Sequence, residues 1–226
     1  YLGITLTSIS IVAMSCTVMT YVLFSELRNL PGLAVLNLCA SNIMFDLTFL
    51  ASSTINMPRD DHLCLIAAIL AHYEGLAAYF WTNVMAADLY LTLGRWSAAP
   101  RSPSKILPRY MLYAYGLPLI IVSIAVTIQF CGCTGDFTID YGLLICWINN
   151  PTANMIFFGI PLALALLANI VLFVKTIVVV QRSTSCPTCT PFEKAVCDNA
   201  TFHLKFDRLF SIITFFRYVT QRDFSR

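Results

Sequence analysis

The sequence predicts an all-α membrane protein: a polytopic helix bundle with five transmembrane helices and a short, partial sixth. Of its 226 residues, 58% are hydrophobic and only 12% are charged, a balance outside that of soluble domains. Five apolar segments are long enough to cross a hydrocarbon core of about 30 Å, and polar loops separate them. The expected spans cover residues 2–24, 33–55, 64–93, 110–130 and 154–180. We therefore expect residues 1–180 to form a transmembrane bundle in the lipid bilayer.

The first two spans are predicted from apolar runs that end at turn residues. Residues 2–24 lack the basic start and short apolar core of a cleaved signal peptide. Because the chain opens directly in this span, we expect any extracellular domain to lie outside this sequence. Pro31-Gly32 is expected to break the chain before residues 33–55.

The third span is expected to be the central helix, because polar residues occur on two of its sides. His72, Tyr79 and Asn83 share one face, since side chains four or seven residues apart return to the same side of a helix. Glu74, Trp81 and Asp88, each seven residues apart, share the opposite face. A carboxylate that faced lipid would cost several kcal/mol. Polar groups on both sides therefore indicate a helix enclosed by others. Glu74 and Asp88 are separated by about 21 Å along the helix, too far for a paired acid–base site.

The remaining spans carry proline and further polar residues. Residues 110–130 contain Pro118, and residues 154–180 contain Pro161 near their start. Proline is tolerated in a membrane helix where neighbouring groups satisfy the carbonyl that it frees. Six residues are expected to form the polar part of the bundle core: Asn37, His72, Glu74, Asn83, Asp88 and Asn169.

The cations indicate the orientation of the bundle. The loop 94–109 holds four cations and no acid, whereas the loop 131–150 holds acids and no cation. Cytoplasmic loops are enriched in Lys and Arg, so the first loop is expected inside and the N-terminus outside. The four cations are Arg95, Arg101, Lys105 and Arg109. The net charge of +2 is too small to suggest nucleic acid as a partner.

The nine cysteines point to one disulfide. Cys64 and Cys146 both fall at extracellular positions, where the compartment is oxidising, so a bond between them is expected to tie the outer loop across the bundle. Two unpaired thiols are the alternative, and Cys131 and Cys133 are competing partners.

A second group of cysteines has parts of a zinc-ligand pattern: Cys186, Cys189, Cys197 and His203. The second pair lacks close spacing, so an ordinary cytosolic loop, with a palmitoylated cysteine as one option, is the favoured interpretation. His72 is likewise expected to be a hydrogen-bonded interior residue rather than a metal ligand. The sequence lacks HExxH, GxSxG and a glycine-rich phosphate loop. We therefore expect no metal, no cofactor and no enzymatic activity.

Short motifs along the chain resemble the secretin/adhesion class of seven-helix G-protein-coupled receptors, most closely the insect Methuselah-like branch. The motifs, in order, are 27–32 (LRNLPG), 37–39 (NLC), 72–73 (HY), 76–81 (LAAYFW), 83–86 (NVMA), 115–118 (YGLP), 141–142 (YG), 146–147 (CW), 158–161 (FGIP) and 168–173 (ANIVLF). Two positions depart from the peptide-hormone receptors of the class. Val35 stands where those receptors carry a histidine and Met85 where they carry a glutamate.

The resemblance implies a fragment of a seven-helix receptor in the plasma membrane. Residues 181–226 would be a cytosolic loop and a sixth helix that is cut short, because the apolar core 209–219 is about half the roughly 20 residues of a span. By resemblance, the receptor would detect an extracellular ligand and couple to a heterotrimeric G protein, which would meet the basic loop. A non-signalling membrane protein that associates with a full-length receptor is the alternative. A small transporter is less favoured, because the repeated halves of transporters are not found.

Overall fold

The computed structural model describes residues 2–54, 62–94, 103–131, 135 and 137–184. Within these residues the chain is mainly helical, and residues 137–150 form a loop in which an isolated bridge pairs Tyr141 with Ile148. In the described part of the chain, five helices are long and apolar enough to cross a membrane: Gly3–Leu23, Leu30–Ser53, His62–Leu93, Pro103–Cys131 and Pro151–Val180. The prediction of an all-α bundle with five membrane helices is confirmed, whereas the partial sixth helix lies outside the described residues.

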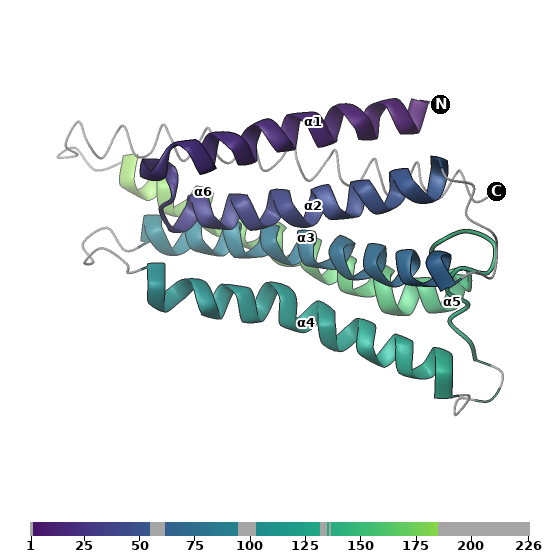
Figure 1. Ribbon diagram of the computed structural model, residues 1–226. Helices are drawn as coiled ribbons and strands as arrows, with labels where there is room; N and C mark the ends of the chain where they lie inside the picture. Colours follow the sequence, from purple (N-terminus) through teal and green to yellow (C-terminus); the bar gives the residue numbers. More distant parts are fainter. Residues whose placement is uncertain (1, 55–61, 95–102, 132–134, 136, 185–226) are drawn as a thin grey trace. The chain divides into compact units, whose positions relative to one another are not determined.

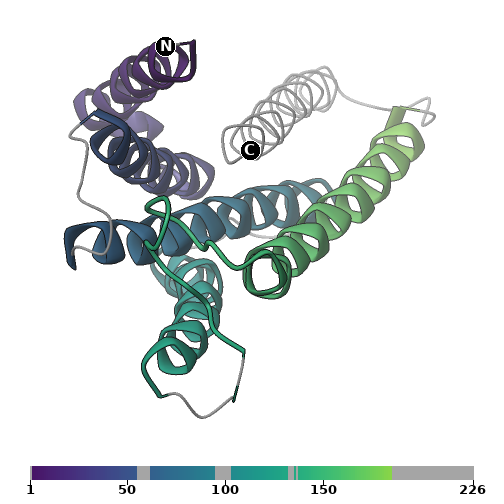
Figure 2. The same cartoon turned by 90° about the vertical axis from the view of Figure 1, so that its right-hand side faces the viewer.

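The helices group into two compact units. The first comprises Tyr1–Met85 and Pro100–Leu166, and the second comprises Ala86–Ala99 and Leu167–Arg226. In the first unit, α1 (Leu2–Leu23) packs along α2 (Leu30–Thr54), and α2 touches α4 (Pro103–Cys131). Figure 1 and Figure 2 show α1 beside α2 in both views.

The third helix, α3 (His62–Gly94), is the most buried of the five. In an apolar 18-residue stretch of its span 61% of the residues are buried, against 33% or less in the corresponding stretches of the others. The largest side chains with almost no exposure include Trp81, Leu76 and His72 of this helix. The burial of α3 agrees with the enclosed position that we predicted from the polar residues on two of its faces.

The second helix begins earlier than expected. It starts at Leu30, so Pro31-Gly32 lies in its first turn and does not break the chain before it. Proline is accepted in a first turn because its missing N–H has no helical partner there. Asn29 caps this end, since its Oδ1 accepts the Gly32 N–H at 2.9 Å. A side chain at Gly32 would collide with the Leu27 carbonyl oxygen, which explains the glycine at the turn from α1.

The fourth helix also begins earlier, at Pro103 rather than at residue 110. Lys105 and Arg109 therefore lie in the first two turns of α4, exposed, and not in a loop as predicted. An apolar run predicts only the part of a helix that lies in lipid, so it does not detect polar turns that extend the helix at its end. Arg95 and Arg101 lie outside the described residues.

The fifth span is built from three consecutive segments. These are α5 (Pro151–Asn154), the π-helical turn η2 (Met155–Gly159) and α6 (Ile160–Thr184). Asn150 caps the start, because its side-chain oxygen accepts the N–H groups of Thr152 and Ala153 at 3.0 and 3.3 Å. A π turn inserts one extra residue into a helix and often marks a functional position.

Candidate functional site

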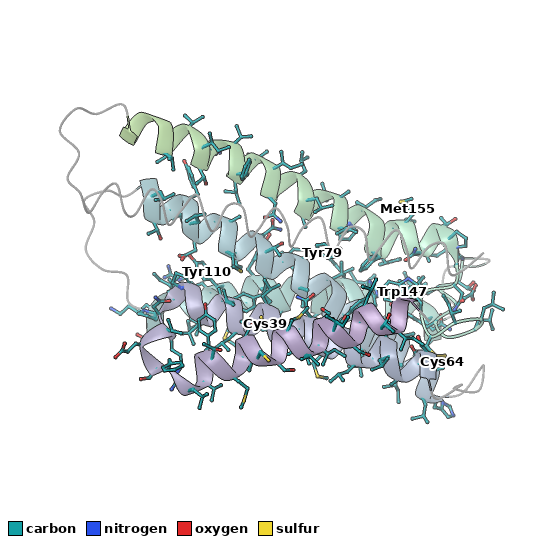
Figure 3. The ribbon with its side chains drawn as sticks, turned by 90° about the horizontal axis from the view of Figure 1, so that it is seen from above. Cys39, Cys64, Tyr79, Tyr110, Trp147 and Met155 are labelled. Carbon is teal, nitrogen blue, oxygen red and sulfur yellow. A yellow bond between two sulfur atoms is a disulfide. The ribbon has the colours of Figure 1, made fainter. Side chains whose placement is uncertain are left out.

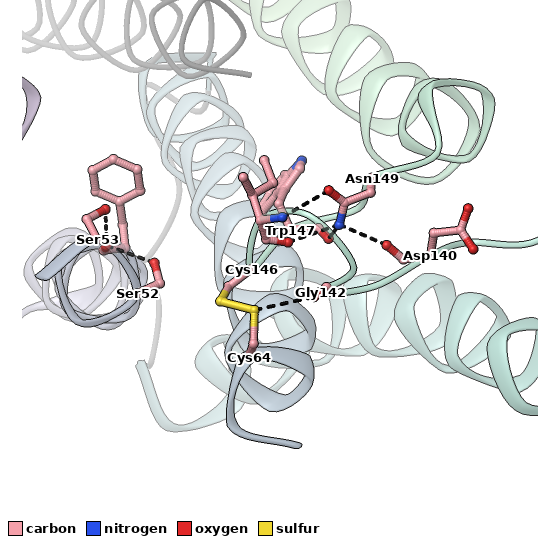
Figure 4. Close-up of a disulfide and its surroundings, with 10 residues drawn as sticks. Ser52, Ser53, Cys64, Asp140, Gly142, Cys146, Trp147 and Asn149 are labelled. Carbon is pink, nitrogen blue, oxygen red and sulfur yellow. Dashed lines mark hydrogen bonds between the residues drawn. A yellow bond between two sulfur atoms is a disulfide. The ribbon is translucent and has the colours of Figure 1, made fainter. Parts of the chain in front are cut away.

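The segment 137–150, called the disulfide loop below, is fastened to the start of α3. Cys146 of the loop is bonded to Cys64 in the first turn of α3, with 4.8 Å between the two Cα atoms (Figure 4). The predicted pairing is thus present. Cys131 forms a separate disulfide, so it does not compete for either partner.

The disulfide loop holds its own shape through backbone and amide hydrogen bonds. The Gly142 N–H donates to the Trp147 carbonyl at 3.0 Å, which closes a tight turn around Cys146. The Asn149 side-chain amide donates to the carbonyls of Asp140 at 3.0 Å and Trp147 at 2.9 Å (Figure 4). These contacts fix the side of the loop that faces α3.

Gly142 lies directly against the backbone of α3. Its φ of +74° belongs to the left-handed region that favours glycine. A Cβ added there would lie 3.2 Å from the Leu65 nitrogen and 3.3 Å from the Cys64 carbonyl carbon. The Cys64 sulfur also lies 3.6 Å from the Gly142 oxygen, a contact rather than a hydrogen bond because a disulfide sulfur has no proton to donate. The loop therefore touches the helix without an intervening side chain.

Below the loop, three aromatic rings from two parts of the chain surround His72. Tyr141 and Trp147 come from the loop and Phe158 from η2, with ring centroids 6.0, 6.3 and 6.0 Å from that of His72. Gly75, one turn further along α3, leaves room for this packing, because a Cβ there would lie 3.3 Å from Phe158 and from Phe45 of α2. Figure 3 shows Trp147 and Met155 at the same end of the bundle as Cys64.

His72 makes two hydrogen bonds, which define the tautomer of the ring in its neutral form. Nε2 lies 3.0 Å from the Phe157 carbonyl oxygen, and Nδ1 lies 2.6 Å from the Tyr141 hydroxyl. A carbonyl can only accept, so Nε2 carries the proton. In the neutral ring Nδ1 is then the acceptor, and the Tyr141 hydroxyl donates to it. Burial raises the pKa of the Tyr141 phenol, which keeps this hydroxyl protonated at neutral pH.

The Phe157 carbonyl needs this histidine because of Pro161. In an α-helix the carbonyl of residue 157 would accept the N–H of residue 161, but proline has none. His72 supplies the donor instead, from the neighbouring helix. We expected a neighbouring group to satisfy the carbonyl that a proline frees in a membrane helix, and His72 is that group here.

The amino-acid sequence of this chain matches a known protein family. The family model described as "7 transmembrane receptor (Secretin family)" matches residues 2–200 of this chain. The chain belongs to the secretin family of seven-transmembrane receptors. This family consists of signalling receptors rather than enzymes, in agreement with the sequence.

Three curated relatives to which this secretin-family chain is similar are adhesion and Methuselah-like receptors. Human adhesion G-protein coupled receptor G2 is 28% identical over 187 residues, which cover 80% of this chain and 18% of that receptor. Human adhesion G-protein coupled receptor G4 is 29% identical over 176 residues, covering 75% and 5%. The probable G-protein coupled receptor Mth-like 4 of Drosophila melanogaster is 27% identical over 181 residues, covering 77% and 34%. The chain thus spans about a third or less of each of these relatives.

Three of the six polar residues expected in the core of this secretin-family bundle have different surroundings within the first unit. His72 lies in the aromatic cluster below the disulfide loop. Asn37 accepts a hydrogen bond from Tyr115 of α4 at 3.2 Å, and Glu74 lies near the buried Ser41 hydroxyl without hydrogen-bond geometry. Asn83 and Asp88 are buried in α3, and Asn169 is half-buried in α6.

Sequence reasoning did not identify the partners of His72. Tyr141 and the Phe157 carbonyl lie 69 and 85 residues away along the chain. Pro161 was the available signal, since it marks a carbonyl four residues earlier that needs a donor. Phe158 packs in the same cluster. The zinc-pattern residues lie outside the described residues, and no group that could hold a metal occurs within them.

Gly142 and Gly135 offer a matched test of the close approach. Both have positive φ, of +74° and +63°, but only Gly142 faces backbone atoms of α3. Alanine at either position should cost about 1 kcal/mol for the backbone conformation, and Gly142→Ala should cost a further 1–3 kcal/mol for the contact. Thermal unfolding of the detergent-solubilised chain should show the larger loss for Gly142→Ala. Equal losses in the two variants would contradict the close approach.

Proposed function

We propose that this chain forms membrane helices of a G-protein-coupled receptor that detects an extracellular ligand at the plasma membrane. The carrying observation is the secretin-family match over residues 2–200. The fastened disulfide loop and its contact with the fifth span support the proposal. Receptors of this kind switch by moving packed helices against one another, and a ligand acts by binding one arrangement better than the other.

The proposed orientation has the N-terminus outside. The disulfide loop follows α4 and needs an oxidising compartment. Lys105 and Arg109 lie in the first turns of α4, at the opposite end of the helix, where the positive-inside rule favours cytoplasm. Two independent features of one helix therefore support the same direction.

In this orientation the two faces of the bundle have different partners. The ligand would meet the outer parts of the third, fourth and fifth spans, beside the disulfide loop. The cations Arg95, Arg101, Lys105 and Arg109 would meet the G protein or the phosphates of the inner leaflet.

A second candidate is a membrane protein that associates with a full-length receptor. The specific observation is α1, in which only 6% of the span is buried. Its exposed large side chains include Leu6, Ile9, Val12 and Met19. Lipid covers such a surface in a monomer, and a second receptor would cover it in a complex.

The receptor function is tested by a chimera. Residues 2–200 of this chain replace the matching segment of human adhesion G-protein coupled receptor G2, and membranes with the chimera are assayed for nucleotide exchange on added G protein. We expect exchange well above membranes without receptor. The double variant Lys105→Gln, Arg109→Gln should couple more weakly at equal surface expression, because it lacks two cations of the cytoplasmic face.

A chimera that reaches the cell surface without stimulating exchange would contradict the receptor function. Co-purification of the unmodified chain with the intact human receptor is measured in parallel. Association in the absence of exchange by the chimera would favour the second candidate.

The orientation is tested at Asn199-Ala-Thr201, which is a glycosylation sequon. With the N-terminus outside and five spans, this segment lies in the cytosol, where it is out of reach of the glycosylation machinery. We expect no change in electrophoretic mobility after glycosidase treatment. A shift that Asn199→Gln abolishes would reverse the orientation.

A further inference from the structure

We propose that His72 is a positioning residue that couples the disulfide loop to the π-helical turn of the fifth span. A displacement of the loop would then change the hydrogen bonding of Met155–Gly159. This inference deepens the proposed receptor function and rests on it only for the claim that the coupling carries a signal.

The coupling follows from the chemistry of a neutral imidazole. One nitrogen donates and the other accepts, so the partner at each nitrogen determines the role of the other. While the Tyr141 hydroxyl donates to Nδ1, the proton must reside on Nε2, where it reaches the Phe157 carbonyl. When Tyr141 withdraws, the ring loses one of the two hydrogen bonds that hold its orientation and polarise it, so the Nε2–H donation to the Phe157 carbonyl weakens. Loop position therefore strengthens or weakens the hydrogen bond that the fifth span receives from His72.

The fifth span is sensitive to this change because Pro161 has no N–H to donate to the Phe157 carbonyl, as residue 161 of a regular α-helix would. An unsatisfied carbonyl in the interior of a membrane bundle is costly, so loss of the His72 donor favours rearrangement of the turn. A π turn is suited to this, since its extra residue gives the chain an alternative hydrogen-bond register.

A second contact between the same elements runs through Trp147. Its indole N–H donates to Asn154 Oδ1 at 3.1 Å, and its ring lies 5.0 Å from that of Phe158. This link holds the loop near the fifth span when the His72 link is cut. A variant that removes only the Tyr141 hydroxyl should therefore leave the loop in place and isolate the effect on the His72 hydrogen bond to the Phe157 carbonyl.

The decisive variant is Tyr141→Phe, which removes the hydrogen bond from the disulfide loop to His72. The response is measured in the fifth span. Amide hydrogen exchange is followed by mass spectrometry on the full chain in lipid nanodiscs. We expect peptides covering 155–162 to exchange about tenfold faster than in the unmodified chain. Tyr115→Phe is the matched control. It also removes one phenol hydrogen bond within the bundle, to Asn37, and should leave this segment unchanged.

Pro161→Ala tests the coupling in the reverse direction. It restores an N–H that competes with His72 for the Phe157 carbonyl, so the Tyr141 contact should weaken by the reciprocity of linked equilibria. Faster exchange of the loop amides Gly142 and Trp147 is expected.

The proposal would be overturned if each substitution changed hydrogen exchange only in the segment that carries it. In that case Tyr141→Phe would accelerate only the loop amides, and Pro161→Ala only those of the fifth span. Neither measurement uses G protein, so a failure here is distinguishable from a failure of the chimera to signal.

Discussion

The attachment of the disulfide loop to α3 is the constraint on which the rest of the described site depends. The Cys64–Cys146 bond closes a segment of 82 residues, and in the chain-entropy treatment a loop of that length restrains the unfolded chain by about 4 kcal/mol. Gly142 allows the loop backbone to lie on the helix backbone. Tyr141 is thereby held where its hydroxyl reaches His72. Without the attachment, the buried imidazole would lose the hydrogen bond that it accepts from Tyr141.

Proline has a similar organising effect in the fifth span. Pro161 removes one helical hydrogen bond, and the chain responds with a π turn and a donor from another helix. The hydrogen bond from His72 to the Phe157 carbonyl links α3 to the fifth span inside the membrane, where few other polar groups compete for either partner. A conventional helix in this position would satisfy its own carbonyl and would not depend on α3.

The sequence predicted what depends on composition and spacing along the chain. Five spans follow from the length of apolar runs, and the enclosed position of α3 follows from polar residues on two of its faces. The bounds at Leu30 and Pro103 were missed, because Pro31 in a first turn and the polar turns around Lys105 do not add to an apolar run. The partners of His72 could not be predicted, since they come from segments far along the chain and one of them is a backbone carbonyl. That partnership depends on the packing of helices, which periodicity does not define.

The most direct measurement of the central claim is disulfide mapping of the chain purified from cell membranes. Proteolysis under non-reducing conditions, with free thiols blocked beforehand, should recover the peptide of Cys64 joined to the peptide of Cys146. On reduction the two peptides should separate. Recovery of Cys64 as a blocked free thiol, or joined to Cys131, would contradict the attachment of the loop to α3.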